Sequence, residues 1–295
     1  MGETNEREVT FVKKPFPWYG GKEQLAPLLV SLFPRHTAYV EVFGGSGAVL
    51  FAKDPSPLEV FNDLDSGVVN FFQVLRNPLQ AEQLTHLLSL TPYAYEEYHD
   101  CLKHWRSEAD PVEKARQWYC GVVQSMNSSI RNTGWSHTKI PGSNPAKRWL
   151  PGIAHLSDCM GRLAHVQIDH RDFAAVLQSY DSEGTCFYID PPYVVETRRK
   201  GGCYHHEMST EDHERLLTRL LALQGMVVLS GYDHPLYQEV LREWECLRVP
   251  VSCASTSRAP VEGEKQLQTK REECIWRNPL CVRHAPIGTQ LTLFA

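Results

Sequence analysis

An alternation of strand-like and helix-like segments constrains the fold of this chain more than any other feature. Residues 38–43 (AYVEVF) are β-branched, apolar and aromatic, as in a buried strand, and residues 44–47 (GGSG) then break the run. Helical character resumes at residues 48–53 (AVLFAK), and a second strand (58–63) and a second helix (66–75) follow in the same order. Strands that alternate with helices predict an α/β fold with a mostly parallel sheet.

This alternation is interrupted once. From about residue 78 to residue 162 the sequence carries Leu, Tyr, Trp, Glu and His at helical spacings, with a polar loop at residues 127–149. Beyond it the pattern returns, with strands predicted at 165–169, 185–190, 226–231, 246–251 and 273–278 and helices at 173–180, 210–223 and 235–244. We therefore predict one sheet domain made of residues 1–77 and 161–295, divided by a mainly helical insertion at residues 78–160.

Composition limits the classes of protein to consider. The chain has 295 residues, 42% of them hydrophobic and 22% charged, which is typical of a globular protein and not of a disordered or fibrous one. Its formal net charge of −5 gives no overall signal for nucleic acid, although a local basic patch can bind nucleic acid in an acidic protein. No apolar run approaches the roughly 18 residues of a membrane span, and the nine cysteines lack the spacing of a metal site. These features predict a cytoplasmic protein with no metal and no membrane contact.

The glycine turn at residues 44–47 lies where the first strand ends, which is the edge at which parallel sheets bind ligands. It lacks the spacing of a phosphate loop and the G-x-G-x-x-G of dinucleotide sites, so it indicates either a cofactor site of another kind or a turn that serves the fold alone. Asp63 ends the second strand about 20 residues later, the spacing at which an acid accepts hydrogen bonds from ribose hydroxyls. The alternative is that Asn62, Asp63 and Asp65 form a turn and cap the next helix, a role that we expect of Asp65.

A second candidate site follows the strand at residues 185–190. Asp190, Pro191, Pro192 and Tyr193 end its apolar run, and the two prolines have no amide hydrogen, so this turn presents hydrogen-bond acceptors. Such acceptors suit the amino group of an aromatic base, whose lone pair is delocalised into the ring. Hydrogen bonds to Asp190 and to the Pro191 carbonyl would make that nitrogen more tetrahedral and its lone pair available. Tyr193 then offers a stacking face for the base.

Three motifs occur together and in order: WYGGK (18–22), EVFGGSG (41–47) and DPPY (190–193). With them the chain resembles the DNA adenine-specific methyltransferases of the Dam type, especially those of phages and prophages. The resemblance implies a Rossmann-like methyltransferase sheet of about seven strands, with S-adenosylmethionine as the methyl donor. It also implies transfer to the 6-amino group of an adenine flipped out of double-stranded DNA, and a target-recognition role for the insertion.

A cofactor site is part of what the resemblance implies. Lys22 would lie near the methionine carboxylate of S-adenosylmethionine, Glu41 would reach its amino group, and Asp63 would hold its ribose. Asp172 and Phe173 would lie against its adenine. The full predicted set of cofactor residues is Trp18, Tyr19, Gly20, Gly21, Lys22, Glu41, Phe43, Gly44, Gly45, Ser46, Gly47, Asp63, Asp172, Phe173 and Asp190. The predicted catalytic residues are Asp190, Pro191, Pro192 and Tyr193, whereas the segments 230–233 and 273–279 resemble structural strands and are assigned no catalysis.

Basic residues beside aromatic ones on loops are the predicted DNA contacts. One group belongs to the insertion, where its aromatic neighbours are Trp135, His137 and Trp149, and the other group follows the catalytic turn. The two groups are Arg131, Lys139, Lys147 and Arg148, and Arg198, Arg199 and Lys200. Each of these residues has an alternative role as part of a solvated loop. The resemblance leaves open whether a restriction endonuclease is a partner.

Other functions stay open at this point. RNA methyltransferases and other amine methyltransferases use a similar turn of two prolines and an aromatic residue, usually with Asn in the first position, whereas this chain has Asp190. A non-catalytic protein could use the same pocket to bind S-adenosylmethionine or DNA, although the intact turn argues against it. A nicotinamide dehydrogenase would need G-x-G-x-x-G and a proton donor, and we find neither.

Overall fold

The structure is a computed structural model, and the part of the chain that it describes comprises residues 12–130, 134–194, 206–251 and 271–285. Four of the predicted DNA contacts lie outside the described residues: Arg131, Arg198, Arg199 and Lys200.

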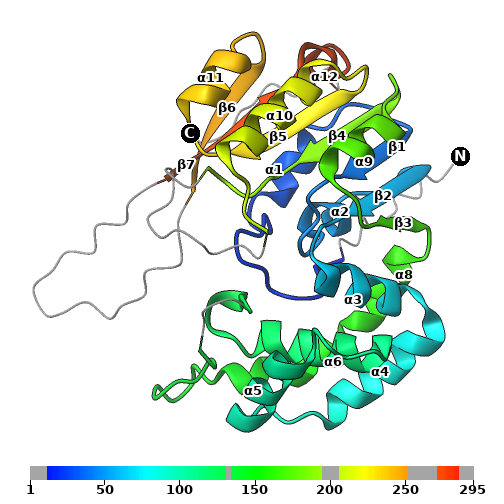
Figure 1. Ribbon diagram of the computed structural model, residues 1–295, viewed down its shortest axis with the longest axis vertical. Helices are drawn as coiled ribbons and strands as arrows, with labels where there is room; N and C mark the ends of the chain where they lie inside the picture. The colour runs from blue at the N-terminus through cyan, green and yellow to red at the C-terminus, as the bar shows by residue number, and fades with distance from the viewer. Residues whose placement is uncertain (1–11, 131–133, 195–205, 252–270, 286–295) are drawn as a thin grey trace, which may run out of the picture.

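Within the described part of the chain, seven strands form one sheet in the order β3-β2-β1-β4-β5-β7-β6 (Figure 1). Their bounds are β1 Ala38–Glu41, β2 Leu58–Asn62, β3 Val166–Asp169, β4 Thr185–Ile189, β5 Met226–Gly231, β6 Glu245–Val251 and β7 Arg271–Arg277. Strands β1 to β5 pair in parallel, and β7 is antiparallel to both of its neighbours, β5 and β6. The predicted α/β fold with a mostly parallel sheet is therefore confirmed.

Helices follow strands β1 to β5, as the alternation predicted. Those of the sheet domain are α1 Ala26–Ser31, α2 Ala48–Ala52, α3 Ser66–Arg76, α9 Phe173–Tyr180, α10 Thr210–Leu221, α11 Pro235–Val240 and α12 Pro279–Arg283. Asp65 caps α3, because its side chain accepts hydrogen bonds from the amides of Gly67 and Val68. The capping role expected of Asp65 is thus confirmed.

Two layers of helices cover the sheet, one on each face. Because successive strand residues point to opposite faces, Tyr39 and Tyr188 pack with α1, α2 and α3, whereas Val40 and Phe187 pack with α9, α10 and α11. All four of these side chains are at most 1% exposed. The central strands are therefore buried on both faces, which explains why their sequences are nearly continuous apolar runs.

The segment between α3 and β3 is helical. It contains α4 Pro78–Leu90, α5 Tyr95–His104, α6 Pro111–Val123, α7 Trp149–Ala154 and α8 Leu156–Leu163, with short 3-10 helices at Met126–Ser128 and Pro145–Arg148. Figure 1 shows α4, α5 and α6 grouped together next to α3. None of the helices in the described ranges combines the length and the hydropathy needed to cross a bilayer.

These helices share a core with the sheet domain. Trp118 of α6 is fully buried, and its ring lies 4.9 Å from that of Phe16 and 5.5 Å from that of Phe71 of α3. A Cβ atom added at Gly67 of α3 would lie 2.2 Å from the Trp118 ring, so α3 and α6 are in close contact at that point. The helical segment and the sheet are thus held together by one continuous set of apolar contacts.

Trp149 does not have the place predicted for it. We expected this residue to lie beside basic residues on a loop, but it begins α7, is 4% exposed, and donates a hydrogen bond from its indole nitrogen to the Thr91 carbonyl at 2.9 Å. A large ring next to a polar loop gains more from burial than from a place in solvent. Trp149 is therefore a core residue.

Candidate active site

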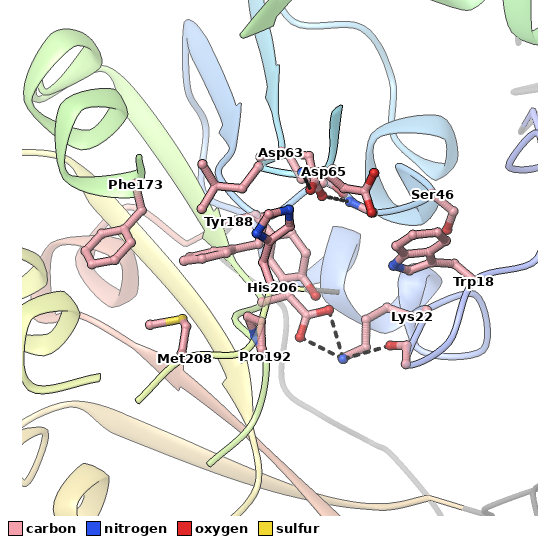
Figure 2. Close-up of a pocket in the computed structure, with 18 of the residues that line it drawn as sticks. Trp18, Lys22, Ser46, Asp63, Asp65, Phe173, Tyr188, Pro192, His206 and Met208 are labelled. Carbon is pink, nitrogen blue, oxygen red and sulfur yellow. Dashed lines mark hydrogen bonds and ion pairs between the residues drawn. The ribbon is translucent and has the colours of Figure 1, made fainter. Parts of the chain in front are cut away.

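A cavity lies at the carboxyl ends of β1 and β4, where the order of the strands reverses. This is the place at which open α/β sheets bind ligands. Figure 2 shows Trp18 and Ser46 on one side of the cavity and Phe173 and Met208 on the other. Most of the predicted cofactor residues line it: Trp18, Tyr19, Gly20, Gly21, Lys22, Glu41, Phe43, Gly44, Gly45, Ser46, Asp63, Asp172, Phe173 and Asp190. Of the predicted catalytic residues, Asp190 and Pro192 line the cavity; Pro191, Tyr193 and the predicted cofactor residue Gly47 are not in its described lining.

The glycine turn after β1 brings backbone rather than side chains to the cavity. A Cβ atom at Gly44 would lie 2.1 Å from the ring of Phe61, and Gly45 has a φ of 51°, in the left-handed region that favours glycine. A Cβ atom at Gly45 would also lie 2.8 Å from the indole of Trp18. Trp18 therefore packs directly on the turn, and larger residues at these positions would separate the two.

Asp63 holds the glycine turn in place. Its two carboxylate oxygens accept hydrogen bonds from the amides of Gly45 and Asp65, each at 2.7 Å. Burial raises the pKa of the Asp63 carboxyl to about 6, with the Asp65 charge adding to the effect. Asp63 therefore takes part in the turn that we considered as its alternative role, and it also lines the cavity.

Glu41, the last residue of β1, is a buried acid on the cavity wall and is 2% exposed. Its Oε2 accepts hydrogen bonds from the Tyr39 hydroxyl at 2.8 Å and from the Leu50 amide at 2.9 Å. Burial nevertheless raises the pKa of Glu41 to about 8. At pH 7 the Glu41 carboxyl is therefore mostly protonated, and it would ionise if a cation were placed beside it.

Asp190 follows β4 directly and is fixed by two side chains. Lys22 Nζ donates to Oδ1 at 2.7 Å and to Oδ2 at 2.9 Å, and the Ser230 hydroxyl donates to Oδ1 at 3.0 Å (Figure 2 shows the Lys22 bonds). A carboxylate oxygen can accept about two hydrogen bonds. Among the described residues, Oδ1 is thus fully used, whereas Oδ2 keeps room for one more donor.

Tyr193 is joined to this group through its hydroxyl, which contacts both Lys22 and Glu273. Its ring is only 7% exposed and meets the ring of Tyr232 edge to face at a centroid distance of 4.4 Å. We expected Tyr193 to offer an open stacking face, but in this structure the ring is mostly covered. Glu273 comes from the segment to which the sequence assigned no catalysis.

Asp172 and Phe173 lie at the start of α9 and line the cavity, and Figure 2 shows Phe173 at the opposite end from Lys22. Asp172 caps the helix through the Ala174 amide and also receives a hydrogen bond from Arg215 at 2.9 Å. The Arg215 guanidinium lies over the Phe173 ring, 4.4 Å from its centroid. Phe173, 3% exposed, gives this end of the cavity an apolar surface.

Several lining residues were not predicted from the sequence. They are Ala48, Val49, Leu64, Asp65, Tyr188, His206, Glu207, Met208, Asp212 and Arg215. Tyr188 had a usable signal, because it lies two residues before Asp190 on a predicted strand. The segment at residues 206–208 had none, since no local pattern says that it returns to the cavity.

The sequence matches the family described as D12 class N6 adenine-specific DNA methyltransferase over residues 18–248. The chain belongs to this family. It therefore transfers a methyl group from S-adenosylmethionine to the 6-amino group of adenine in DNA, as the resemblance implied.

Three proteins to which this methyltransferase is similar are named type II methyltransferases. Type II methyltransferase M1.LlaDCHI of Lactococcus lactis subsp. cremoris is 27% identical over 269 residues, which are 85% of this chain and 92% of that protein. Type II methyltransferase M.MjaIII of Methanocaldococcus jannaschii is 25% identical over 200 residues, 61% of this chain and 69% of that protein. Type II methyltransferase M.FokI of Planomicrobium okeanokoites is 20% identical over 282 residues, 87% of this chain but 42% of that longer protein.

The cavity of the methyltransferase fits S-adenosylmethionine in charge and in hydrogen-bonding capacity. The cofactor carries a net positive charge, and the acidic residues of the lining outnumber its basic ones, Lys22, His206 and Arg215. Ser46 adds a polar group, because its buried hydroxyl has no hydrogen-bond partner among the described residues. A buried hydroxyl of this kind is costly unless a ligand pairs with it. The acidic lining residues are Glu41, Asp63, Asp65, Asp172, Asp190, Glu207 and Asp212.

The described DNA-contact candidates of the methyltransferase lie on the surface of the helical segment between α3 and β3. Lys139, Lys147 and Arg148 are all exposed. Trp135 is half-buried, donates a hydrogen bond to Gln124, and stacks on His137 at a ring distance of 5.7 Å. The exposed cations are compatible with phosphate contacts, and their role in DNA binding remains a prediction.

Proposed function

We propose that the cavity holds S-adenosylmethionine with its methionine end near Glu41, its ribose beside Asp63 and its adenine against Phe173. Three features support this arrangement. Glu41 is a buried acid that can pair with an ammonium group. Asp63 accepts a hydrogen bond from the Gly45 amide of the glycine turn, and Phe173 forms the apolar end of the lining. Lys22 contacts Asp190 here, so a methionine carboxylate would compete with Asp190 for this ammonium.

We also propose that Asp190 prepares the adenine amino group for methylation. The observation that carries this proposal is the carboxylate at the end of β4, fixed by Lys22 and Ser230 with room for one donor on Oδ2. An amino group that donates to this oxygen and to the Pro191 carbonyl becomes more tetrahedral, and its lone pair turns toward the cavity. S-adenosylmethionine, when bound, supplies an electrophilic methyl group.

The remaining work of the chain is positioning and electrostatics. The Asp190 carboxylate stabilises the positive charge that develops on the amine, and the amine proton then leaves to water. A base inside a duplex cannot reach this site, so adenine must be flipped out at a cost of a few kcal/mol. We still propose that the flipped adenine stacks on the ring of Tyr193. Because Tyr193 is only 7% exposed, the residues that cover this ring must move when the base enters.

The test is methylation of unmethylated duplex DNA with labelled S-adenosylmethionine, followed by nucleoside analysis. Wild-type protein is expected to label the 6-amino group of adenine, and Asp190→Asn to lower the rate by on the order of 100-fold or more, since it removes the charge but keeps the shape. Asp233→Asn is the matched control, because Asp233 follows the neighbouring strand β5 and pairs with Arg248 at the surface. Label on RNA or protein instead of DNA would reject the substrate, and full activity of Asp190→Asn would reject the role of Asp190.

Three finer points belong to the same proposal. The reaction requires no metal, because the methyl group is already electrophilic, and chelation should leave the rate unchanged. The enzyme works in the cytoplasm, where its DNA substrate lies. Because several relatives are named type II methyltransferases, a restriction endonuclease that recognises the same DNA sequence is the partner we propose.

A further inference from the structure

We propose that Glu273 is a positioning residue for methyl transfer, which holds the Tyr193 hydroxyl and offsets the charge of Lys22 so that the catalytic turn keeps a net negative charge. This inference deepens the proposed function and rests on it. Sequence motifs gave Glu273 no role, and the antiparallel strand β7 brings it to the site from the far end of the chain.

Glu273 is buried and contacts two residues of the candidate site, Tyr193 and Lys22. It is 3% exposed, its Oε1 accepts a hydrogen bond from the Tyr193 hydroxyl, and the same oxygen lies 3.5 Å from Lys22 Nζ. A carboxylate is seldom buried unless it is paired, because removing its charge from water is costly. Glu273 thus closes a continuous polar group that runs from Asp190 through Lys22 and Tyr193.

The charges of this group explain what Glu273 adds. Lys22 is 7% exposed, and although burial alone would lower its pKa, the carboxylates of Asp190 and Glu273 raise it, so Lys22 is a cation at neutral pH. Asp190 and Lys22 alone would carry no net charge. With Glu273 ionised, the group carries one net negative charge beside the position where the amine becomes positive.

Burial raises the pKa of Glu273, and the Lys22 ammonium opposes that effect. Rates are therefore best compared at more than one pH, because a higher pH favours the carboxylate form of Glu273. Single-turnover rates at saturating S-adenosylmethionine separate the methyl-transfer step from cofactor binding.

The first test compares two neighbouring glutamates of β7. Glu273→Gln keeps the shape and an oxygen for Tyr193 but removes the charge, and it should slow single-turnover methylation on the order of 10- to 100-fold. The dissociation constant for S-adenosylmethionine should change by less than about threefold. Glu272→Gln is the matched control, because this side chain is 59% exposed on the opposite face of the strand, and wild-type rates are expected.

A second test separates charge from structure. If charge is the cause, Glu273→Asp, which keeps the carboxylate, should methylate faster than Glu273→Gln, which keeps the size of the side chain. If Glu273 only fills space in the fold, the shorter Glu273→Asp should lose at least as much activity as Glu273→Gln. Should Glu273→Gln fail to fold, as judged by circular dichroism, Glu273→Asp keeps the charge and is expected to fold and to retain activity within about tenfold of wild type.

The outcomes distinguish this inference from the proposed function. Wild-type rates for Glu273→Gln, or equal losses for Glu273→Asp and Glu273→Gln, overturn the role of Glu273 while leaving adenine methylation intact. Failure of the wild-type protein to label adenine in DNA would instead refute the proposed function itself.

Discussion

The buried carboxyl of Glu41 predicts that cofactor binding is coupled to the loss of a proton. Burial raises the pKa of Glu41 to about 8, so the carboxyl is mostly neutral at pH 7. The proposed site places the cofactor's ammonium group beside it, which would lower that pKa and ionise the carboxyl. Binding should then release a proton from Glu41, and the affinity should rise with pH.

The size of the effect follows from the pKa of Glu41. With a pKa of about 8, roughly 1% of Glu41 is ionised at pH 6 and roughly 9% at pH 7, so binding to the ionised form costs about 1.4 kcal/mol at pH 7 and about twice that at pH 6. Affinity should therefore rise about ninefold between pH 6 and pH 7. The α-amino group of the cofactor, with an ordinary pKa of about 7.7 to 8.0, stays largely protonated over this range.

Isothermal titration calorimetry at pH 6 and pH 7, in buffers of different ionisation enthalpy, measures both quantities. We expect release of about 0.9 proton per S-adenosylmethionine bound at pH 7. Glu41→Gln is the control. This variant should bind S-adenosylmethionine more weakly, and its affinity should lose most of the dependence on pH. The smaller contribution of Asp63, whose pKa is about 6, acts in the same direction and should remain. Equal affinity at the two pH values, or the same slope in Glu41→Gln, would refute the reasoning.

The stability of the ligand-free protein should show the opposite pH dependence. A carboxyl whose pKa is higher in the folded state than its ordinary value of 4.5 favours folding at low pH, and this contribution is lost as the pH rises from about 4.5 to about 8. Chemical denaturation should show that Glu41→Gln removes this loss, so its stability relative to wild type increases between pH 5 and pH 8. A constant difference would contradict the raised pKa.

Three further predictions concern the turn, the cap and the insertion. Gly45→Ala forces a left-handed residue against Trp18 and should lower the free energy of unfolding by about 1 to 2 kcal/mol, measured by urea denaturation, and weaken cofactor binding; unchanged stability would contradict the contact. Asp65→Ala removes the cap of α3 and should cost about 0.5 to 2 kcal/mol of stability, most of which Asp65→Asn should retain. Lys147→Gln combined with Arg148→Gln should reduce the slope of log affinity for duplex DNA against log salt by about 0.9 per lost phosphate contact, and an unchanged slope in fluorescence anisotropy would place DNA elsewhere.

The strands could be predicted from the sequence because each is a local pattern. Residues 38–41 and 185–189 are buried on both faces, so their apolar runs stand out from the surrounding polar sequence. The cap at Asp65 is equally local, since it depends on residues two and three positions away. The order of the strands depends on contacts between segments that are distant in the sequence. No local pattern in residues 271–277 predicts that this strand lies between β5 and β6.

The candidate site was predictable where a motif carries it and not where distant segments meet. Asp190 belongs to a recognisable turn, but its contact with Lys22 joins residues 168 positions apart, and the Glu273 contact with Tyr193 joins residues 80 apart. Trp149 was misplaced because the neighbouring composition is polar, whereas the apolar side of α7 faces the core. Local composition predicts exposure poorly when a single large ring can be buried by a neighbouring helix.

The place of β7 between β5 and β6 has a consequence for when the enzyme becomes active during its synthesis. Strand β6 leaves the ribosome before β7, yet β7 is its described neighbour and separates it from β5. Until β7 emerges and inserts, the edges of β5 and β6 that it pairs with stay open, and Glu273 is missing from the group around Asp190. A nascent chain that stops short of residue 271 can therefore form most of the parallel sheet while lacking the Glu273 contacts with Tyr193 and Lys22, so we expect full methylation activity only after β7 has been made.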